Sequence, residues 1–284
     1  MMNRSEHGQT ALGRPEMQAH RNFLDSALPL LEEQNEIIGI LGAGSLISGE
    51  MDEFSDLDLI IVVEAGDFEG VMGRRLEIAR SLGPLLSGFT GEHVGEPRLL
   101  ICLYGPPALH VDLKFVALPD LAKRVEEPVI LWGRDERVGE LLGQTQGVYP
   151  QPDWQWVEDR FWVWIHYGAT KIGRGEWMEA EAMLGFLNSL VFGPLSLLEA
   201  GKKPNGLRHI ERDAPERTQH LMSIRAEAMA QDGLRAYQGA AKLYQSLRKT
   251  ANLPPGFVAR DEAERVSLEY LEKIGRRGRT IQAD

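Results

Sequence analysis

The stretch from Gly42 to Val63, GAGSLISGEMDEFSDLDLIIVV, combines a Gly-Ser turn, two carboxylates and an aliphatic run within a short span. From Leu57 onward almost every residue is aliphatic, which predicts a central strand covered on both faces. Asp56 and Asp58 stand where this strand begins. Because residues i and i+2 of a strand project to the same face, roughly 6.6 Å apart along the chain, both carboxylates are expected to face one space.

Two anions at the start of a buried strand resist removal from water, and their charges repel each other. A divalent cation would compensate both effects. Oxygen ligands suit Mg²⁺, which commonly takes one or two protein carboxylates and fills its other positions with water and substrate phosphates. The sequence therefore predicts a Mg²⁺ site at Asp56 and Asp58.

The first half of the stretch predicts a binding site for the substrate phosphates. Residues Ile37 to Leu41 form a short apolar strand that leads into Gly44 and Ser45 and a helix-like turn. Glycine lets backbone N–H groups approach an anion, and the serine hydroxyl adds a donor. A dinucleotide-binding G-x-G-x-x-G motif is excluded because Ile47 stands at the third glycine position, and no G-x-x-x-x-G-K-[ST] loop occurs.

A Gly-Ser pair, ten residues and an Asp-x-Asp entering an apolar strand resemble the signature of the polymerase-β-like nucleotidyltransferases. The flanking sequence is similar to the branch that adenylylates aminoglycoside and lincosamide antibiotics. The resemblance implies a Mg²⁺-dependent nucleotidyltransferase, an enzyme that transfers a nucleoside monophosphate to a hydroxyl of a small molecule. The expected donor is ATP, which would supply AMP. Pyrophosphate would be released, and the biological role would be antibiotic resistance.

The same resemblance implies a third carboxylate on a neighbouring strand, and Asp112 in the apolar run Leu109 to Leu118 is the candidate. Asp56 and Asp58 would hold one metal ion and Asp112 would complete a second site. Two ions about 3.5 to 4 Å apart form the usual clamp for in-line displacement at phosphorus. Gly44 and Ser45 would fix the β and γ phosphates of the nucleotide.

The chain of 284 residues is predicted to have two domains. An α/β (α+β) nucleotidyltransferase domain with a mixed sheet is expected over residues 15–145, after a mobile tail over residues 1–14. A Gly-, Pro- and Gln-containing linker, 143–152, leads to an all-α helical-bundle domain over residues 153–284. The predicted strands are 37–41, 57–63, 85–90, 98–104 and 109–118, a strand and turn fall within 128–138, and the predicted helices are 15–34, 68–82, 119–125, 154–172, 175–199, 214–232, 234–251 and 261–274.

Four further charged side chains are candidates whose roles stay open. The resemblance implies that Lys171 reaches the triphosphate, although a surface lysine is the alternative. Glu176 follows a Gly-Arg-Gly break, where it could cap a helix or act as the base that takes the acceptor's proton. Glu158 and Glu92 are rivals for the role of base, as is Asp112, and a solvated acid is the alternative for each glutamate.

The balance of charge favours a small, cationic acceptor over a nucleic acid. The chain has 31 Lys and Arg against 42 Asp and Glu, a formal net charge of −11, whereas phosphate-backbone binders normally show a basic face. The single cysteine, Cys102, lies in an apolar run, which predicts a buried side chain. One cysteine excludes an internal disulfide, which fits a reducing compartment. Neither a signal peptide nor a membrane-length apolar stretch is expected, so the predicted location is the cytoplasm.

Two alternatives to a small-molecule acceptor remain open from the sequence. The same chemistry could act on an RNA 3′ end or a protein hydroxyl, or the chain could be a catalytically silent nucleotide sensor. A sensor has no need of the third carboxylate. The base of the nucleotide and the oligomeric state, including a homodimer, also stay open.

Overall fold

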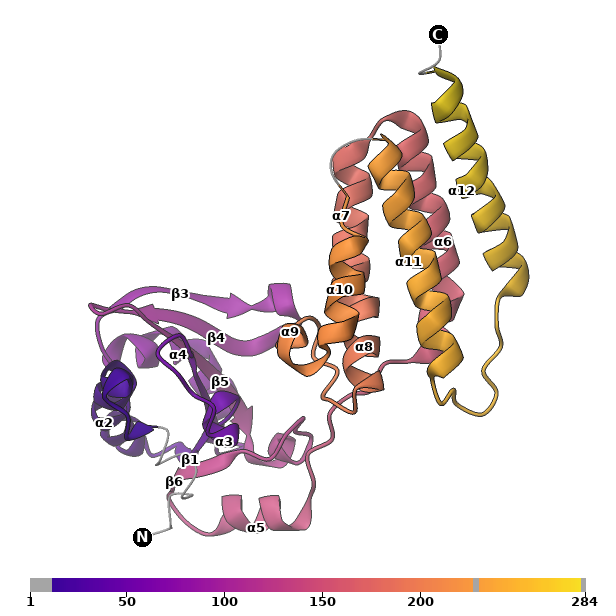
Figure 1. The fold of residues 1–284 in the computed structure, drawn as a ribbon. Helices are drawn as coiled ribbons and strands as arrows, with labels where there is room; N and C mark the ends of the chain where they lie inside the picture. Colours follow the sequence, from indigo (N-terminus) through magenta and orange to yellow (C-terminus); the bar gives the residue numbers. More distant parts are fainter. Residues whose placement is uncertain (1–11, 227–229, 282–284) are drawn as a thin grey trace. The chain divides into compact units, whose positions relative to one another are not determined.

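The computed structural model describes residues 12–226 and 230–281, and the chain divides into two compact units, Met1–Pro150 and Gln151–Asp284 (Figure 1). Each unit has a hydrophobic core of its own. Most of the predicted tail, residues 1–11, lies outside the described residues. Arg14 is anchored, because its guanidinium donates a 3.0 Å hydrogen bond to the carbonyl of Met51.

A six-stranded mixed sheet forms the centre of the first unit. Its strand order is β3-β4-β5-β2-β1-β6, in which β2 and β5 are parallel and every other neighbouring pair is antiparallel. The predicted α+β class is therefore confirmed. The strands are β1 (Ile37–Gly42), β2 (Leu57–Val63), β3 (Leu85–Gly91), β4 (Glu96–Tyr104), β5 (Leu109–Ala117) and β6 (Val129–Gly133).

One face of this sheet is covered by helices along the whole of β2. The helices α2 (Gln18–Glu32) and α4 (Phe68–Ser81) pack on it and bury the odd-numbered residues of the strand. Burying each such aliphatic side chain contributes about 1.5–3 kcal/mol. This face holds most of the hydrophobic core of the first unit.

The other face is covered at one end only. There Val62 packs with the 3-10 turn η3 (Leu118–Ala122) and the helix α5 (Arg137–Gln144), whereas Asp58 and Ile60 are half-buried. The prediction of a strand covered on both faces is therefore wrong for the first half of β2. The two carboxylates and the residues beside them stay open to a ligand for this reason.

The connections follow the predicted pattern with one addition. The 3-10 turn η1 (Pro15–Met17) precedes α2, the one-turn helix α3 (Ser45–Ser48) follows β1, and the 3-10 turn η2 (Glu92–Val94) joins β3 to β4. The helix α5 was not expected; it begins after β6 and includes the first two residues of the predicted linker. Two further linker residues are bonded within the first unit, Gly147 to Glu127 and Val148 to Arg124.

The described residues of the second unit form helices and no strand, in agreement with the predicted all-α domain. Asp153 begins the first helix, because its carboxylate accepts a 3.0 Å hydrogen bond from the backbone N–H of Trp156. Aromatic side chains with at most 1% exposure fill the centre, among them Phe161, Trp162 and Tyr244. The helices are α6 (Trp154–Arg174), α7 (Trp177–Leu187), the π-turn η4 (Asn188–Phe192), α8 (Gly193–Glu199), α9 (Ile210–Asp213), α10 (Pro215–Ser223), α11 (Ala230–Thr250) and α12 (Asp261–Ile281).

Within the described residues one helical run, Trp177–Glu199, has the length and composition of a membrane span. Its mean hydropathy is 1.4, and 44% of the window is buried inside the structure. The expectation that no apolar stretch has this length is therefore wrong. Core helices of soluble proteins pass the same test, so the run is weak evidence for a membrane.

Candidate active site

The Gly-Ser turn lies against the Asp58 carboxylate. Gly44 has φ 56° and ψ −130°, a conformation open to glycine and strained for other residues. A Cβ built on Gly44 would lie 2.0 Å from Asp58 Oδ2, closer than any real contact. The backbone of the turn is fixed to the same strand, since the Ala43 N–H donates a 2.9 Å hydrogen bond to the Asp58 carbonyl. Glycine is therefore required here by both conformation and space.

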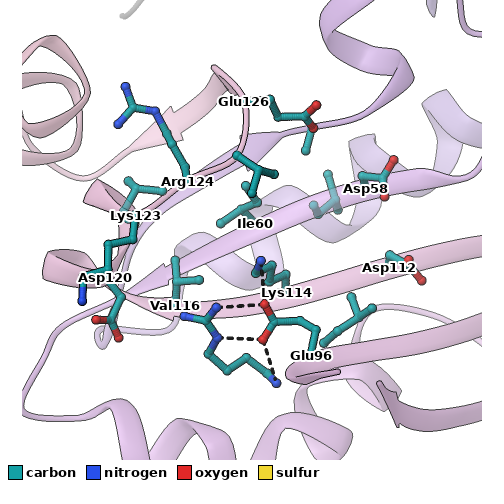
Figure 2. A pocket seen from close by; sticks show the side chains of 16 residues that line it. Asp58, Ile60, Glu96, Asp112, Lys114, Val116, Asp120, Lys123, Arg124 and Glu126 are labelled. Carbon is teal, nitrogen blue, oxygen red and sulfur yellow. Dashed lines mark hydrogen bonds and ion pairs between the residues drawn. The ribbon is translucent and has the colours of Figure 1, made fainter. Parts of the chain in front are cut away.

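Two of the predicted aspartates lie on adjacent parallel strands, and the third lies just before one of these strands. The register of β2 and β5 places Asp58 directly beside Asp112 (Figure 2). Asp56 lies just before β2, two residues ahead of Asp58. Since alternate residues share a face, all three belong to the open face of the sheet. The spacing seen in the sequence thus brings the third carboxylate beside the other two.

A histidine joins this group. One ligand atom from each of Asp56, His110 and Asp112 can be chosen so that all three lie within 4.8 Å of one another. His110 Nε2 lies 2.9 Å from Asp112 Oδ1. A nitrogen and two carboxylates therefore converge on one small space at the start of β2 and β5.

The electrostatic environment raises the pKa of Asp112. Burial of the carboxyl group is the main cause, His110 opposes it, and the neighbouring charge of Asp56 adds to it. The carboxylate is thus ionised at a cost that a bound cation would remove. The carboxylates and the imidazole present fit a divalent cation.

Gly44 and Ser45, the two residues predicted to bind phosphate, differ in their surroundings. The Ser45 hydroxyl oxygen is buried and has no hydrogen-bond partner among the described residues, so it could donate to a ligand only if the turn moved to expose it. The Gly44 N–H instead donates a 3.0 Å hydrogen bond to the Glu126 carboxylate. A phosphate could use that N–H only if Glu126 moved, which the sequence did not indicate.

A pocket of about 220 Å³ extends from Asp58 and Asp112 over the open face of the sheet (Figure 2). This volume is below the usual size of a whole ligand site, so the pocket accommodates a part of a larger substrate. Apolar and charged side chains alternate on its walls. The apolar ones are Ile60, Leu99, Val116, Leu121 and Val125, and the charged ones include Glu96, Arg98, Lys114, Asp120, Lys123 and Glu126.

Glu96 organises two of the cations in this pocket. Its carboxylate accepts 2.8 Å contacts from the Arg98 guanidinium and from Lys114 Nζ (Figure 2). Hydrogen bonds from Arg98, followed by those from Lys114, lower the pKa of Glu96 to about 2. Both cations are thereby held on the open face close to the aspartates.

In the second unit Lys171 and Glu176 form an ion pair. Lys171 Nζ lies 2.6 Å from Glu176 Oε2, and the ammonium lies 5.0 Å from the ring centre of Tyr167. The hydrogen bond from Lys171 lowers the pKa of Glu176. Glu176 occupies the N-cap position of α7 without a capping hydrogen bond from its side chain. The two candidates are neighbours, and each neutralises the other.

The candidacy of Glu158 as a base is not supported by its surroundings. The residue is fully buried and its carboxylate accepts hydrogen bonds from Tyr244 Oη at 2.6 Å, Arg248 at 2.7 Å and the Arg260 N–H at 2.8 Å. Both carboxylate oxygens thus accept hydrogen bonds from donors of the helical core. Glu158 is therefore a structural residue, and no catalytic role is assigned to it.

Glu92 and Cys102 are simpler cases. Glu92 is exposed in η2, where a hydrogen bond with Thr90 lowers the pKa of its carboxyl group. Cys102 is 1% exposed, and burial raises the pKa of its thiol to about 12, so the predicted buried cysteine is confirmed. Glu92 keeps the solvated environment of a loop acid.

Sequence reasoning missed two functional-looking groups. His110 precedes Asp112 by two residues on a strand, a spacing that places both side chains on one face and could have been noticed. In the cluster around Glu96, Arg98 lies two residues away on the same strand, a local spacing that could also have been noticed. Lys114 had no such signal, because it reaches Glu96 only through the pairing of β4 with β5.

No protein-family model matches the sequence, and no curated protein matches it. Several solved structures are similar to it, and two of them are described here. An aminoglycoside 6-adenyltransferase from Bacillus subtilis has 16% identity and a TM-score of 0.35, with 92% of this chain and 98% of that chain covered. A nucleotidyltransferase-like protein from Exiguobacterium sibiricum has 15% identity and a TM-score of 0.34, with 83% and 76% covered. Both similar proteins are named as nucleotidyltransferases or as like them.

Proposed function

We propose that the chain is a polymerase-β-like nucleotidyltransferase that transfers a nucleoside monophosphate to a hydroxyl group and releases pyrophosphate. The observation that carries the proposal is the meeting of Asp58 and Asp112 in register on an open sheet face, beside the unpartnered hydroxyl of Ser45. Two carboxylates held side by side on an open sheet face fit a site for a cation and phosphates. The sequence signature and the sheet geometry support the same chemistry independently.

In this proposal Asp56, Asp58 and Asp112 hold one or two Mg²⁺ ions. The metal, when bound, supplies positive charge that offsets the charge of the phosphates. The chain's own groups position the nucleotide: the Ser45 hydroxyl donates to a phosphate oxygen, and Lys114 and Arg98 lie in the adjoining pocket. Transfer of this kind depends on positioning and charge rather than on covalent help from the protein.

The acceptor's hydroxyl oxygen forms the new bond to the α-phosphorus, and the bond to pyrophosphate breaks. Asp112 is the proposed acceptor of the hydroxyl proton, because its half-buried carboxylate belongs to the same face as Asp58. Glu176 and Lys171 remain proposals for the second unit, as a base and as a ligand of the triphosphate. Their mutual ion pair would have to open for either role.

The finer identity of the substrates is also a proposal. The net charge of −11 and the resemblance to antibiotic-modifying enzymes favour a small cationic acceptor such as an aminoglycoside or a lincosamide, and ATP as the donor. A cytoplasmic location agrees with the single buried cysteine. A homodimer and a role in antibiotic resistance belong to the same set of proposals.

The test is release of pyrophosphate with Mg²⁺ and each of the four nucleoside triphosphates, with and without a panel of aminoglycosides and lincosamides. The control is Asp58→Asn, which keeps the shape of the side chain and removes its charge. Release that needs one acceptor and is lost in the control is the expected result. Turnover equal in wild type and control would refute the metal assignment, and nucleotide binding without turnover on any acceptor would favour a sensor.

A further inference from the structure

Four side chains with metal-binding atoms stand in two rows on the open face of the sheet. The parallel register pairs Asp58 with Asp112. Asp56 and His110 each lie two residues earlier in the chain than one of these aspartates, Asp56 just before β2 and His110 on β5, and ligand atoms of the two lie within 4.8 Å of each other. The cluster thus contains three carboxylates and one imidazole, and the nitrogen ligand distinguishes it from an all-oxygen site.

The contacts place the imidazole within the cluster rather than beside it. His110 Nε2 is 2.9 Å from Asp112 Oδ1, and the ligand atoms of Asp56, His110 and Asp112 lie within 4.8 Å of one another. Metal bonds of about 2.0–2.2 Å to such ligands leave donor atoms roughly 3–4 Å apart around one ion. Small side-chain rotations would therefore bring all three onto a single cation.

Accessibility is also suitable for an ion that must enter from water. The side chain of His110 is 48% exposed and that of Asp112 is 19% exposed, so one ligand faces solvent while the other anchors the site. A site of three protein ligands leaves coordination positions open for water or substrate. An exposed histidine of purely structural value would not need a place among two carboxylates.

The donor set decides which ion fits best. Mg²⁺ selects oxygen ligands and binds imidazole weakly, whereas first-row transition ions accept imidazole nitrogen together with carboxylate oxygen. We infer that His110 is a metal ligand together with Asp56 and Asp112, and that it raises the affinity of this position for a divalent transition ion, such as Mn²⁺, relative to its affinity for Mg²⁺. The inference deepens the proposed function and rests on it for the ion's purpose, but ion binding itself needs no turnover.

The experiment uses Mn²⁺ alone as the probe, added to the full chain without nucleotide. Electron paramagnetic resonance measures bound Mn²⁺, and electron spin echo modulation detects a coordinated imidazole nitrogen. The variants are His110→Gln and, as a matched control, His93→Gln, because His93 is an exposed histidine outside the cluster. Circular dichroism checks that both variants are folded.

Wild type and His93→Gln are expected to bind Mn²⁺ with nitrogen modulation, and His110→Gln is expected to lose the modulation. The Mn²⁺ affinity of His110→Gln should fall tenfold or more, while its Mg²⁺ affinity, measured by competition, changes less than about twofold. Absence of Mn²⁺ binding in wild type, bound Mn²⁺ without nitrogen modulation, or an unchanged ratio of the two affinities in His110→Gln would overturn the inference. If His110→Gln fails to fold, the presence or absence of nitrogen modulation in wild type still tests whether an imidazole coordinates the ion.

The outcomes also separate this inference from the proposed function. Nitrogen modulation in a protein that releases no pyrophosphate with any acceptor would keep the metal ligand and refute the transfer reaction. Pyrophosphate release that needs Asp58, from a protein whose bound Mn²⁺ shows no nitrogen signal, would keep the reaction and refute the role of His110.

Discussion

Two carboxylates, one in each unit, lie in opposite environments that indicate different roles. Glu158 in the helical unit has no exposed surface, yet its oxygens are surrounded by donors from Tyr244, Arg248 and Arg260. Asp112 in the sheet unit is only partly buried, but its neighbours include Asp56, and its pKa is raised. Donors of the fold surround the first carboxylate, whereas the second has one imidazole partner, His110, and another carboxylate beside it.

The difference comes from where each residue lies in its fold. Glu158 is on the inner face of α6, where residues 86 to 102 positions away along the chain supply donors. Asp112 is on the half of the sheet face that no helix covers. Partners from the fold make a carboxylate structural, and a crowded, half-open position makes it a candidate for function.

The largest expected effect is on stability, from Glu158→Ala. Removing this carboxylate leaves Arg248 and the other donors without their shared acceptor, which costs about 3–5 kcal/mol in the free energy of unfolding. Denaturant unfolding followed by tryptophan fluorescence measures it, because five of the six tryptophans lie between Trp154 and Trp177.

The matched control is Glu272→Ala, since Glu272 is exposed and forms one i,i+4 pair with Arg276. Its expected effect is within about 0.5 kcal/mol. A loss below about 1 kcal/mol for Glu158→Ala would show that the buried carboxylate is dispensable, and the comparison between the two units would fail.

Gly44→Ala tests the close packing at the site. The strained backbone costs about 1–3 kcal/mol, and the new methyl group forces the Asp58 carboxylate to move. We expect pyrophosphate release to fall by about 100-fold, the size of effect that a 1 Å misplacement of a reacting group can have. Gly95→Ala is the control, because Gly95 also has positive φ, 76°, but no atom stands within 4 Å of the added Cβ. Equal losses in both variants would point to strain alone.

Glu96→Gln is expected to have a smaller, pH-dependent effect. The lowered pKa of Glu96 means that its ion pairs stabilise the folded state above its ordinary pKa of 4.5 and that this contribution is lost as the pH falls towards about 2. For a partly exposed group the contribution is about 1 kcal/mol at pH 7. Chemical denaturation followed by circular dichroism should show a difference from wild type at pH 7 that closes near pH 2, and a difference independent of pH would contradict the pairing.

Asp112→Asn should have the smallest effect on stability, with the opposite sign. A raised pKa means that ionised Asp112 lowers the stability of the fold, a cost that grows as the pH rises from its ordinary value of 3.8 through the raised value. Without metal ions at pH 7, the neutral amide should leave β5 as stable as in wild type or slightly more stable. Hydrogen exchange of the β5 amides measures this, and faster exchange in Asp112→Asn would place the residue with Glu158 among the structural acids.

Most of the elements could be predicted from the sequence, and so could the position of three of the four side chains that we propose as metal ligands, because their signals are local. Apolar runs and the Gly-Ser and Asp-x-Asp spacing identify β1, β2 and the aspartates, and a later Asp in an apolar run identifies β5. The helix α5 was missed because it is short and buries only Val138. Its packing beside η3 then covers only one end of the sheet face.

What could not be predicted depends on partners that are distant along the chain. Glu158 looked like a possible base because its sequence neighbours do not reveal Tyr244 or Arg248. The bond from Gly44 to Glu126 joins residues 82 positions apart, and it changes how the turn could meet a phosphate. Both Glu158 and Gly44 are residue types that can take part in a reaction or bind a phosphate. What each can do depends on the distant residues that it contacts in the fold.

The most direct test of the central claim is the stabilisation of the first unit by Mg²⁺ and ATP together, compared between wild type and Asp58→Asn. A ligand at about 100 times its dissociation constant stabilises the folded state by ~2.7 kcal/mol. The account predicts this gain for wild type, measured by slowed hydrogen exchange in β2 and β5, and none for Asp58→Asn. An equal gain in both proteins would contradict the assignment of these carboxylates to a metal and nucleotide site.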